Sequence, residues 1–81
     1  MPSTSIPMLT PTSNHFTIET EQEDDHRWIA EVLEISGVLV YGNTEQQAIT
    51  KAQALALRVI ADKLEHGEMA FGLTSFEFVA A

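Results

Sequence analysis

Hydrophobic and polar residues alternate in two neighbouring segments of the first half of the chain, residues 15–22 and residues 27–33. One side of each segment carries its more apolar residues: Phe16, Ile18 and Thr20, then Trp28, Ala30 and Val32. A period of two is typical of a strand with one buried face. The acidic residues 23–25 separate the segments and do not favour a strand, so the pattern predicts a β-hairpin.

A third apolar segment, residues 38–41, follows Gly37 without a polar interruption. Four consecutive apolar residues predict a strand that is covered on both faces, or covered on one face and bordered by an interface on the other. Gly42 and Asn43 end this segment, because neither residue favours a strand.

A helix is predicted from Thr44 to Gly67. Thr44 is a favourable N-cap residue, and Gln47 three positions later completes a capping-box pattern. Gly67 suits the left-handed position that ends many helices. One arc of the helix is apolar: Ala48, Ile49, Ala52, Ala56, Val59 and Ile60. The alanines on this arc would let the helix lie close to a sheet. On the polar side, Arg58 and Asp62 are four residues apart and are expected to form an ion pair.

Leu57, Ala61 and Leu64 widen the apolar arc beyond what one sheet face requires. Two interpretations are open. Either the N-terminal segment or residues 69–73 cover these side chains, or they form a contact in a homo-oligomer.

The last predicted strand, residues 74–79, places Phe76 and Phe78 on one face. The resulting order is β-β-β-α-β, an α+β fold. A right-handed crossover from the third strand to the fourth puts the helix on one face of a four-stranded sheet. The opposite face stays partly apolar and is a candidate interface. Together with the wide helical arc, it gives the candidate partner-binding residues Ile29, Leu33, Leu39, Tyr41, Leu57 and Leu64.

Length and charge narrow the possible functions. The 81 residues suffice for one domain, which we place at residues 15–81, after a Pro-, Ser- and Thr-rich tail, residues 1–14, that is expected to be flexible. Twelve acidic residues against four Lys and Arg give a net charge of −8. Binding of nucleic acid needs several cationic contacts to phosphate, so it is not expected. The charge either favours a basic partner or only keeps the domain soluble.

The sequence contains no recognisable catalytic or metal-binding motif. It has no cysteine, and its three histidines have no second ligand at metal spacing. Gly-rich phosphate loops, nucleophile elbows and Ser–His–Asp sets are also missing. We therefore expect no cofactor and no enzymatic activity. One alternative is a vestigial nuclease that uses Glu19, Glu45 and Glu77. Another is a small-molecule-binding regulatory module, although the sequence shows no pocket signature.

Export and membrane insertion are not expected either. The first fourteen residues hold no Lys or Arg, and no stretch approaches the ~20 apolar residues that span a bilayer. A cytoplasmic location follows as an expectation.

Several short motifs occur in order along the chain. They are Arg27-Trp28-Ile29-Ala30-Glu31-Val32, Gly37-Val38, Tyr41-Gly42-Asn43-Thr44 and Gln47-Ala48. Together they resemble the HicB-like antitoxin family, in which a strand, a glycine and a Gly-Asp/Asn-Thr turn precede a long helix. The resemblance covers residues 15–79. The motif and structural positions are Trp28, Ala30, Gly37, Gly42, Asn43, Thr44, Gln47, Ala48 and Gly67.

The resemblance implies a degraded RNase H-like fold without nuclease activity. It also implies self-association, and neutralisation of a small basic RNase toxin of the HicA type by covering its active surface. Family members that bind DNA do so through a C-terminal ribbon-helix-helix or helix-turn-helix segment. No such segment follows the last predicted strand before Ala81. DNA binding by this chain alone is therefore not expected, and an orphan copy without a toxin is a further interpretation.

Overall fold

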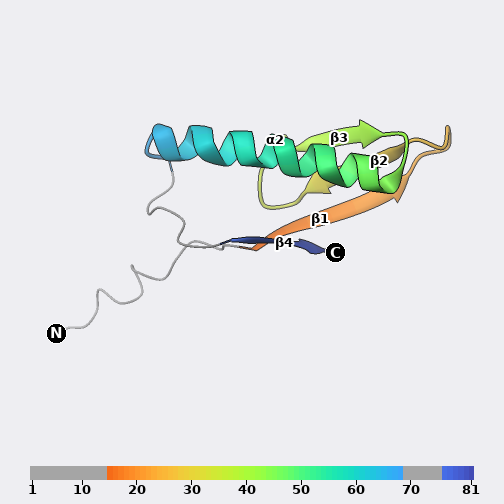
Figure 1. The fold of residues 1–81 in the computed structure, drawn as a ribbon, viewed down its shortest axis with the longest axis horizontal. Coiled ribbons are helices and arrows are strands. Elements are labelled where there is room, and N and C mark those ends of the chain that lie inside the picture. The colour runs from red at the N-terminus through yellow and green to blue at the C-terminus, as the bar shows by residue number, and fades with distance from the viewer. Residues whose placement is uncertain (1–14, 69–75) are drawn as a thin grey trace.

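The computed structural model describes residues 15–68 and 76–81. Its elements, in chain order, are β1 (His15–Gln22), β2 (Trp28–Val32), β3 (Leu39–Gly42), α2 (Glu45–Glu65) and β4 (Glu77–Ala80) (Figure 1). The predicted order β-β-β-α-β is thus confirmed. The tail expected at residues 1–14, the covering segment expected at residues 69–73, and the first two residues of the expected last strand lie outside the described residues.

The four strands form one mixed sheet in the order β3-β2-β1-β4. β1 pairs antiparallel with β2 and parallel with β4, and β2 pairs antiparallel with β3. β3 and β4 therefore run in the same direction on opposite edges, so the chain has to cross the sheet between them. α2 makes that crossing and covers one face of the sheet, which confirms the expected α+β architecture (Figure 1).

The core lies between α2 and the face of the sheet that α2 covers. Its buried hydrophobic residues are Phe16, Ile18, Ala30, Val32, Ile35, Val38, Ala48, Ala52, Ala56 and Ile60. The helix contributes mainly alanines spaced four residues apart, and all three are fully buried. Their short side chains let the helix approach the sheet closely, as the sequence pattern predicts. In β1 and β2 the even-numbered residues face the core, so the predicted alternation is confirmed.

Residues 23–27 join β1 to β2 in a tight loop. The N–H of Glu23 donates to the carbonyl of Arg27 (2.7 Å), and the N–H of His26 donates to the carbonyl of Glu23 (2.9 Å). His26 adopts a φ of 71°, the left-handed conformation that closes such loops. This position favours glycine, so the loop holds His26 in a strained conformation.

Beyond the end of β2, the side chain of Glu34 hydrogen-bonds to Thr17 of β1. One of its carboxylate oxygens accepts the N–H of Thr17 (2.6 Å), and the other accepts the Thr17 hydroxyl (2.7 Å). Partial desolvation raises the pKa of Glu34, but the two hydrogen bonds from Thr17 outweigh it, and the pKa lies below its usual value. The folded state therefore favours the ionised carboxylate.

The start of α2 is fixed by two reciprocal hydrogen bonds. The Thr44 hydroxyl accepts the N–H of Gln47 (3.0 Å), and the Gln47 side-chain oxygen accepts the N–H of Asn43 (2.6 Å). The predicted capping box is thus confirmed, with the glutamine reaching one residue further back than the N-cap itself.

The end of α2 is a Schellman turn. Gly67, with a φ of 69°, donates its N–H to the carbonyl of Leu64 (3.2 Å), and the N–H of Glu68 donates to the carbonyl of Lys63 (2.8 Å). The helical stop predicted at Gly67 is confirmed.

The predicted ion pair between Arg58 and Asp62 is wrong. Asp62 instead lies 3.3 Å from Nδ1 of His66, one turn further on, and its backbone carbonyl contacts the same ring at 2.8 Å. The C-terminal turn brings His66 back over Asp62, and Arg58 has no ion-pair partner among the described residues.

Candidate protein-binding surface

The sheet face opposite α2 is not covered by any described element. Two rows of side chains cross this face from β3 through β2 to β1: Leu39–Glu31–Glu19 and Tyr41–Ile29–Glu21. We call these six residues the open face. Leu39 and Tyr41 are 45% and 41% exposed. The open face is therefore apolar near the β3 edge and acidic toward β1. Among the described residues, β3 is therefore covered on one face only, and the interface expected on its other face stays a prediction.

The structure brings some of the candidate partner-binding residues together and separates others. Ile29, Leu39 and Tyr41 lie on the open face, and Leu33 follows β2 directly, with its N–H bonded to the carbonyl of Thr17. The remaining two candidates, Leu57 and Leu64, are exposed on α2, which lies on the other side of the sheet. The six candidates therefore belong to two surfaces rather than one.

Like charges oppose each other on the open face. Glu19 pairs directly with Glu31 across β1 and β2, an arrangement that lowers the stability of an antiparallel sheet. With Glu21 and Ile29 they line a shallow hollow of about 290 Å³. None of the three carboxylates forms an ion pair or hydrogen bond with another described residue. A cation from outside the described residues would relieve this repulsion.

Arg27, at the corner of the open face, already has two partners. Its guanidinium lies 4.5 Å from the centre of the Tyr41 ring, and its Nε donates to a carboxylate oxygen of Asp25 at 2.7 Å. Hydrogen bonding from the Arg27 backbone, assisted by its side chain, holds the pKa of Asp25 below its usual value. Arg27 thus contacts both the hairpin loop and the Tyr41 ring at the edge of the open face.

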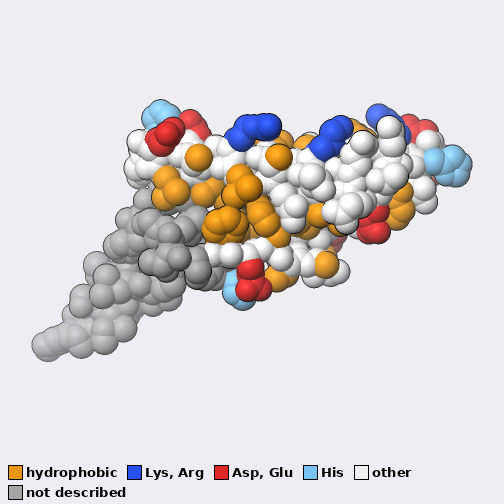
Figure 2. All heavy atoms as spheres, viewed as in Figure 1, with side chains coloured by type: hydrophobic (Ala, Val, Ile, Leu, Met, Phe, Trp, Pro, Cys, Tyr) orange, Lys and Arg blue, Asp and Glu red, His pale blue; other side chains and the backbone are white. Residues whose placement is uncertain are grey.

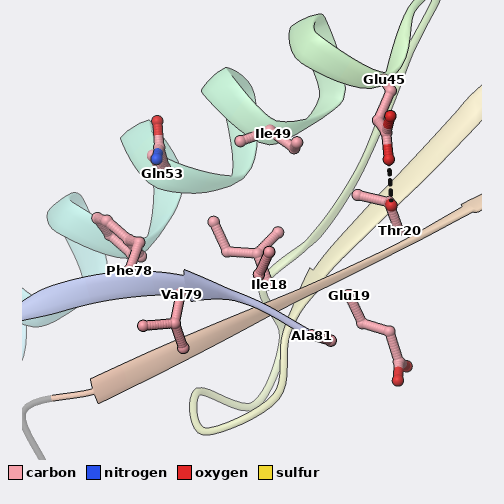
Figure 3. A pocket seen from close by; sticks show the side chains of 10 residues that line it. Ile18, Glu19, Thr20, Glu45, Ile49, Gln53, Phe78, Val79 and Ala81 are labelled. Atoms are coloured by element: carbon pink, nitrogen blue, oxygen red, sulfur yellow. Dashed lines mark hydrogen bonds between the residues drawn. The ribbon is translucent and has the colours of Figure 1, made fainter.

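The three acids of the nuclease alternative do not converge. Glu45 lies at the start of α2, where it accepts a hydrogen bond from the Thr20 hydroxyl (2.7 Å), whereas Glu19 points away from α2 (Figure 3). Glu77 lies opposite His15 in the register of β4 and β1. His15 and Glu19 are four residues apart on β1, so their Cα atoms are separated by roughly 13 Å. Within residues 15–68 and 76–81 no three potential metal ligands lie close enough to hold an ion.

A groove between α2, β1 and β4 has no signature in the sequence. It encloses about 410 Å³; Ile49 lines it from α2, and Ile18 and Phe78 line it from the strands on the opposite side (Figure 3). Glu45 and Gln53 stand at its polar side. The residues come from three elements that are distant along the chain, so no local motif could have predicted the groove.

A second groove lies between β3 and α2. It encloses about 520 Å³, with Val40, Ala54 and Leu55 as its apolar lining and Lys51 and Arg58 as its cationic groups. The sequence pattern places Lys51 and Arg58 on the polar side of the helix but does not predict the groove, because the position of β3 beside that side depends on the strand order.

Comparison of the chain with models of protein families, with curated proteins and with solved structures found no match. Among the described residues, no helix is both long and apolar enough to cross a membrane.

Proposed function

We propose that this chain is a non-catalytic, HicB-like antitoxin-type domain that neutralises a small basic RNase toxin of the HicA type by protein–protein contact. The observation that carries the proposal is the open face, where exposed apolar residues adjoin two directly opposed carboxylates. The family motifs, including the capped Gly42-Asn43-Thr44 turn, and the net charge of −8 support it. A degraded RNase H-like fold is part of the same proposal.

The chemistry of the open face suits a basic partner. A Lys or Arg of the toxin placed between Glu19 and Glu31 would replace their mutual repulsion with two attractions. Leu39, Tyr41 and Ile29 beside them would lose water on contact and supply the apolar part of the interface. The electrostatic attraction would also accelerate association and make it sensitive to salt.

The proposal is tested by co-expressing this chain with the product of any reading frame beside the gene that encodes a small basic protein. We expect co-purification and restored growth of cells that produce the toxin. Glu31→Gln should weaken binding but raise the free energy of unfolding of the isolated domain by about 0.2–1 kcal/mol, because it removes the like-charge pair.

Glu65→Gln, which removes the same charge from the end of α2, is the matched control and should leave toxin binding unchanged. Equal loss of binding in both variants would contradict the role of the open face. If no small basic RNase binds the unmodified chain, the antitoxin function is wrong.

The groove in Figure 3 supports a second candidate function, a small-molecule-binding regulatory module. Its lining combines apolar side chains with a few polar ones, which is the usual composition of a ligand pocket. A thermal-shift screen of metabolites tests this function, with Ile49→Ala as the variant that should abolish any stabilisation; a flat response would exclude the candidate.

Self-association is part of the HicB-like proposal, and Leu57 and Leu64, exposed on α2, support it. Sedimentation of the Leu57→Ser variant beside the unmodified chain tests this contact.

A further inference from the structure

The outer edge of β3 has backbone groups that no described strand pairs. β3 is the first strand in the sheet order, so only β2 lies beside it. The N–H of Val32 donates to the carbonyl of Val38 (3.0 Å), which directs the backbone of Val38 toward β2. Because the direction alternates along a strand, the backbone groups of Leu39 and Tyr41 point away from β2.

Lys51 forms a hydrogen bond with one of these outward backbone groups. Its ammonium donates to the carbonyl of Tyr41 at 3.0 Å, from the neighbouring turn of α2. Lysine beside a sheet edge commonly prevents unwanted strand pairing. This contact is solvent-exposed, so an incoming strand could take over the carbonyl while the ammonium moves to a nearby anion.

The groove beside this edge is locally cationic. Lys51 and Arg58 both line it, and Arg58 has no ion-pair partner among the described residues. Asp62, the nearest acid along the helix, is held by His66. Lys and Arg side chains accordingly lie along the upper rim of the molecule in Figure 2, over α2. Half of the four Lys and Arg residues in a chain of net charge −8 thus face one apolar groove.

We infer that the edge of β3 binds an extended acidic segment of another protein as a fifth strand. Side chains of an added strand alternate between the two faces of the sheet. On one side they would lie beside Leu39 and Tyr41 and would be apolar. On the other side they would lie over the groove, where Asp or Glu would pair with Lys51 and Arg58. The segment should therefore alternate acidic and apolar residues.

The site for an added strand shares Leu39 and Tyr41 with the proposed toxin site, but its charged residues are Lys51 and Arg58 rather than Glu19 and Glu31. The toxin site favours a basic partner, whereas the β3 edge favours an acidic one. The net charge of −8 would slow the approach of an acidic segment, but the contacts made at the edge are short-range and less affected by distant charges.

The test uses a blocked octapeptide in which Val and Glu alternate, titrated into the full chain labelled for amide NMR. We expect saturable shifts of the Leu39 and Tyr41 amides. The double variant Lys51→Gln/Arg58→Gln should bind at least about tenfold more weakly. Lys63→Gln, which removes a cation elsewhere on α2, is the matched control and should bind normally.

Several outcomes would overturn the inference. They are no binding of the Glu peptide, equal binding of a Val/Lys peptide, or shifts that map away from β3. Equal displacement by a single-stranded RNA oligomer would show a general polyanion site instead. Concentration-dependent shifts of the Leu39 and Tyr41 amides without peptide would show that a second copy of this chain occupies the edge.

Discussion

Gly42 lies where β3 ends and the chain turns into α2, and we expect its replacement by alanine to be strongly destabilising. A Cβ at this position would lie 2.5 Å from the backbone nitrogen of Ala48 and 2.9 Å from its Cα. Both are backbone atoms of the first turn of α2, so no side-chain rotation can relieve the overlap. The helix itself would have to move.

The size of the effect follows from these distances. Ordinary contact begins at 3.4 Å, so the start of α2 would shift by about 0.9 Å. That shift would separate Ala48 and Ala52, both fully buried, from the sheet. Overpacking of this kind costs about 1–3 kcal/mol, and loss of a capping hydrogen bond adds about 0.5–1.5 kcal/mol. We expect a total of about 3 kcal/mol, or a Tm lower by roughly 12–24 °C for a domain of this length.

The assay is urea unfolding followed by the fluorescence of Trp28, the single tryptophan. Gly37→Ala and Gly67→Ala are matched controls, because a Cβ at either position meets no atom within 4 Å. Their positive φ values cost only backbone strain, about 1–2 kcal/mol. If Gly42→Ala unfolds at the same urea concentration as these controls, the steric argument is refuted.

Three further predictions concern single contacts. Thr44→Ala should lower the free energy of unfolding by about 1 kcal/mol, and most of this loss should persist in a Gln47→Ala background, because alanine keeps the backbone N–H that the Thr44 hydroxyl accepts; a double-mutant cycle measures both values. Because the pKa of Glu34 is lowered in the folded state, its carboxylate stabilises the fold at a pH above 4.5, the ordinary pKa, and this stabilisation is lost as the pH falls through the folded-state pKa. The difference in stability between wild type and Glu34→Gln should therefore shrink on acidification. A constant difference in urea midpoint from pH 7 to pH 3 would contradict this. His26→Gly should raise Tm by relieving about 1 kcal/mol of strain at positive φ, whereas an unchanged or lower Tm would show that the histidine stabilises the loop.

The features that the sequence predicted correctly are local. The alternation in β1 and β2, the cap at Thr44 and the stop at Gly67 each depend on residues within one element or turn. The wrong pairing of Arg58 with Asp62 shows the limit of such spacing rules. Two side chains four residues apart can meet, but the backbone at the helix end placed His66 closer to Asp62.

The features that the sequence did not predict depend on which elements become neighbours. The contact between Lys51 and Tyr41 requires β3 to lie at the edge beside α2. The groove that Ile18, Ile49 and Phe78 line requires β4 to pair with β1. Hydrophobic periodicity specifies which face of a strand is buried. It does not specify the order of strands in the sheet, so the open face could be predicted from strand alternation but the two grooves could not.

The strand order also explains why net charge alone is a poor guide to the partners of this domain. Side chains alternate between the two faces along β1 and β2, and this alternation puts Glu19 and Glu31 on the open face, away from α2. Lys51 and Arg58 lie on the helix beside the β3 edge. Two surfaces of opposite local charge therefore meet at β3. The side chains of Leu39 and Tyr41 lie on the open face, and the outward backbone groups of the same residues form the edge beside the cationic groove. A basic globular partner and an acidic extended segment would both contact the side chains of Leu39 and Tyr41, so the charged residues on either side of them decide which partner binds at which surface.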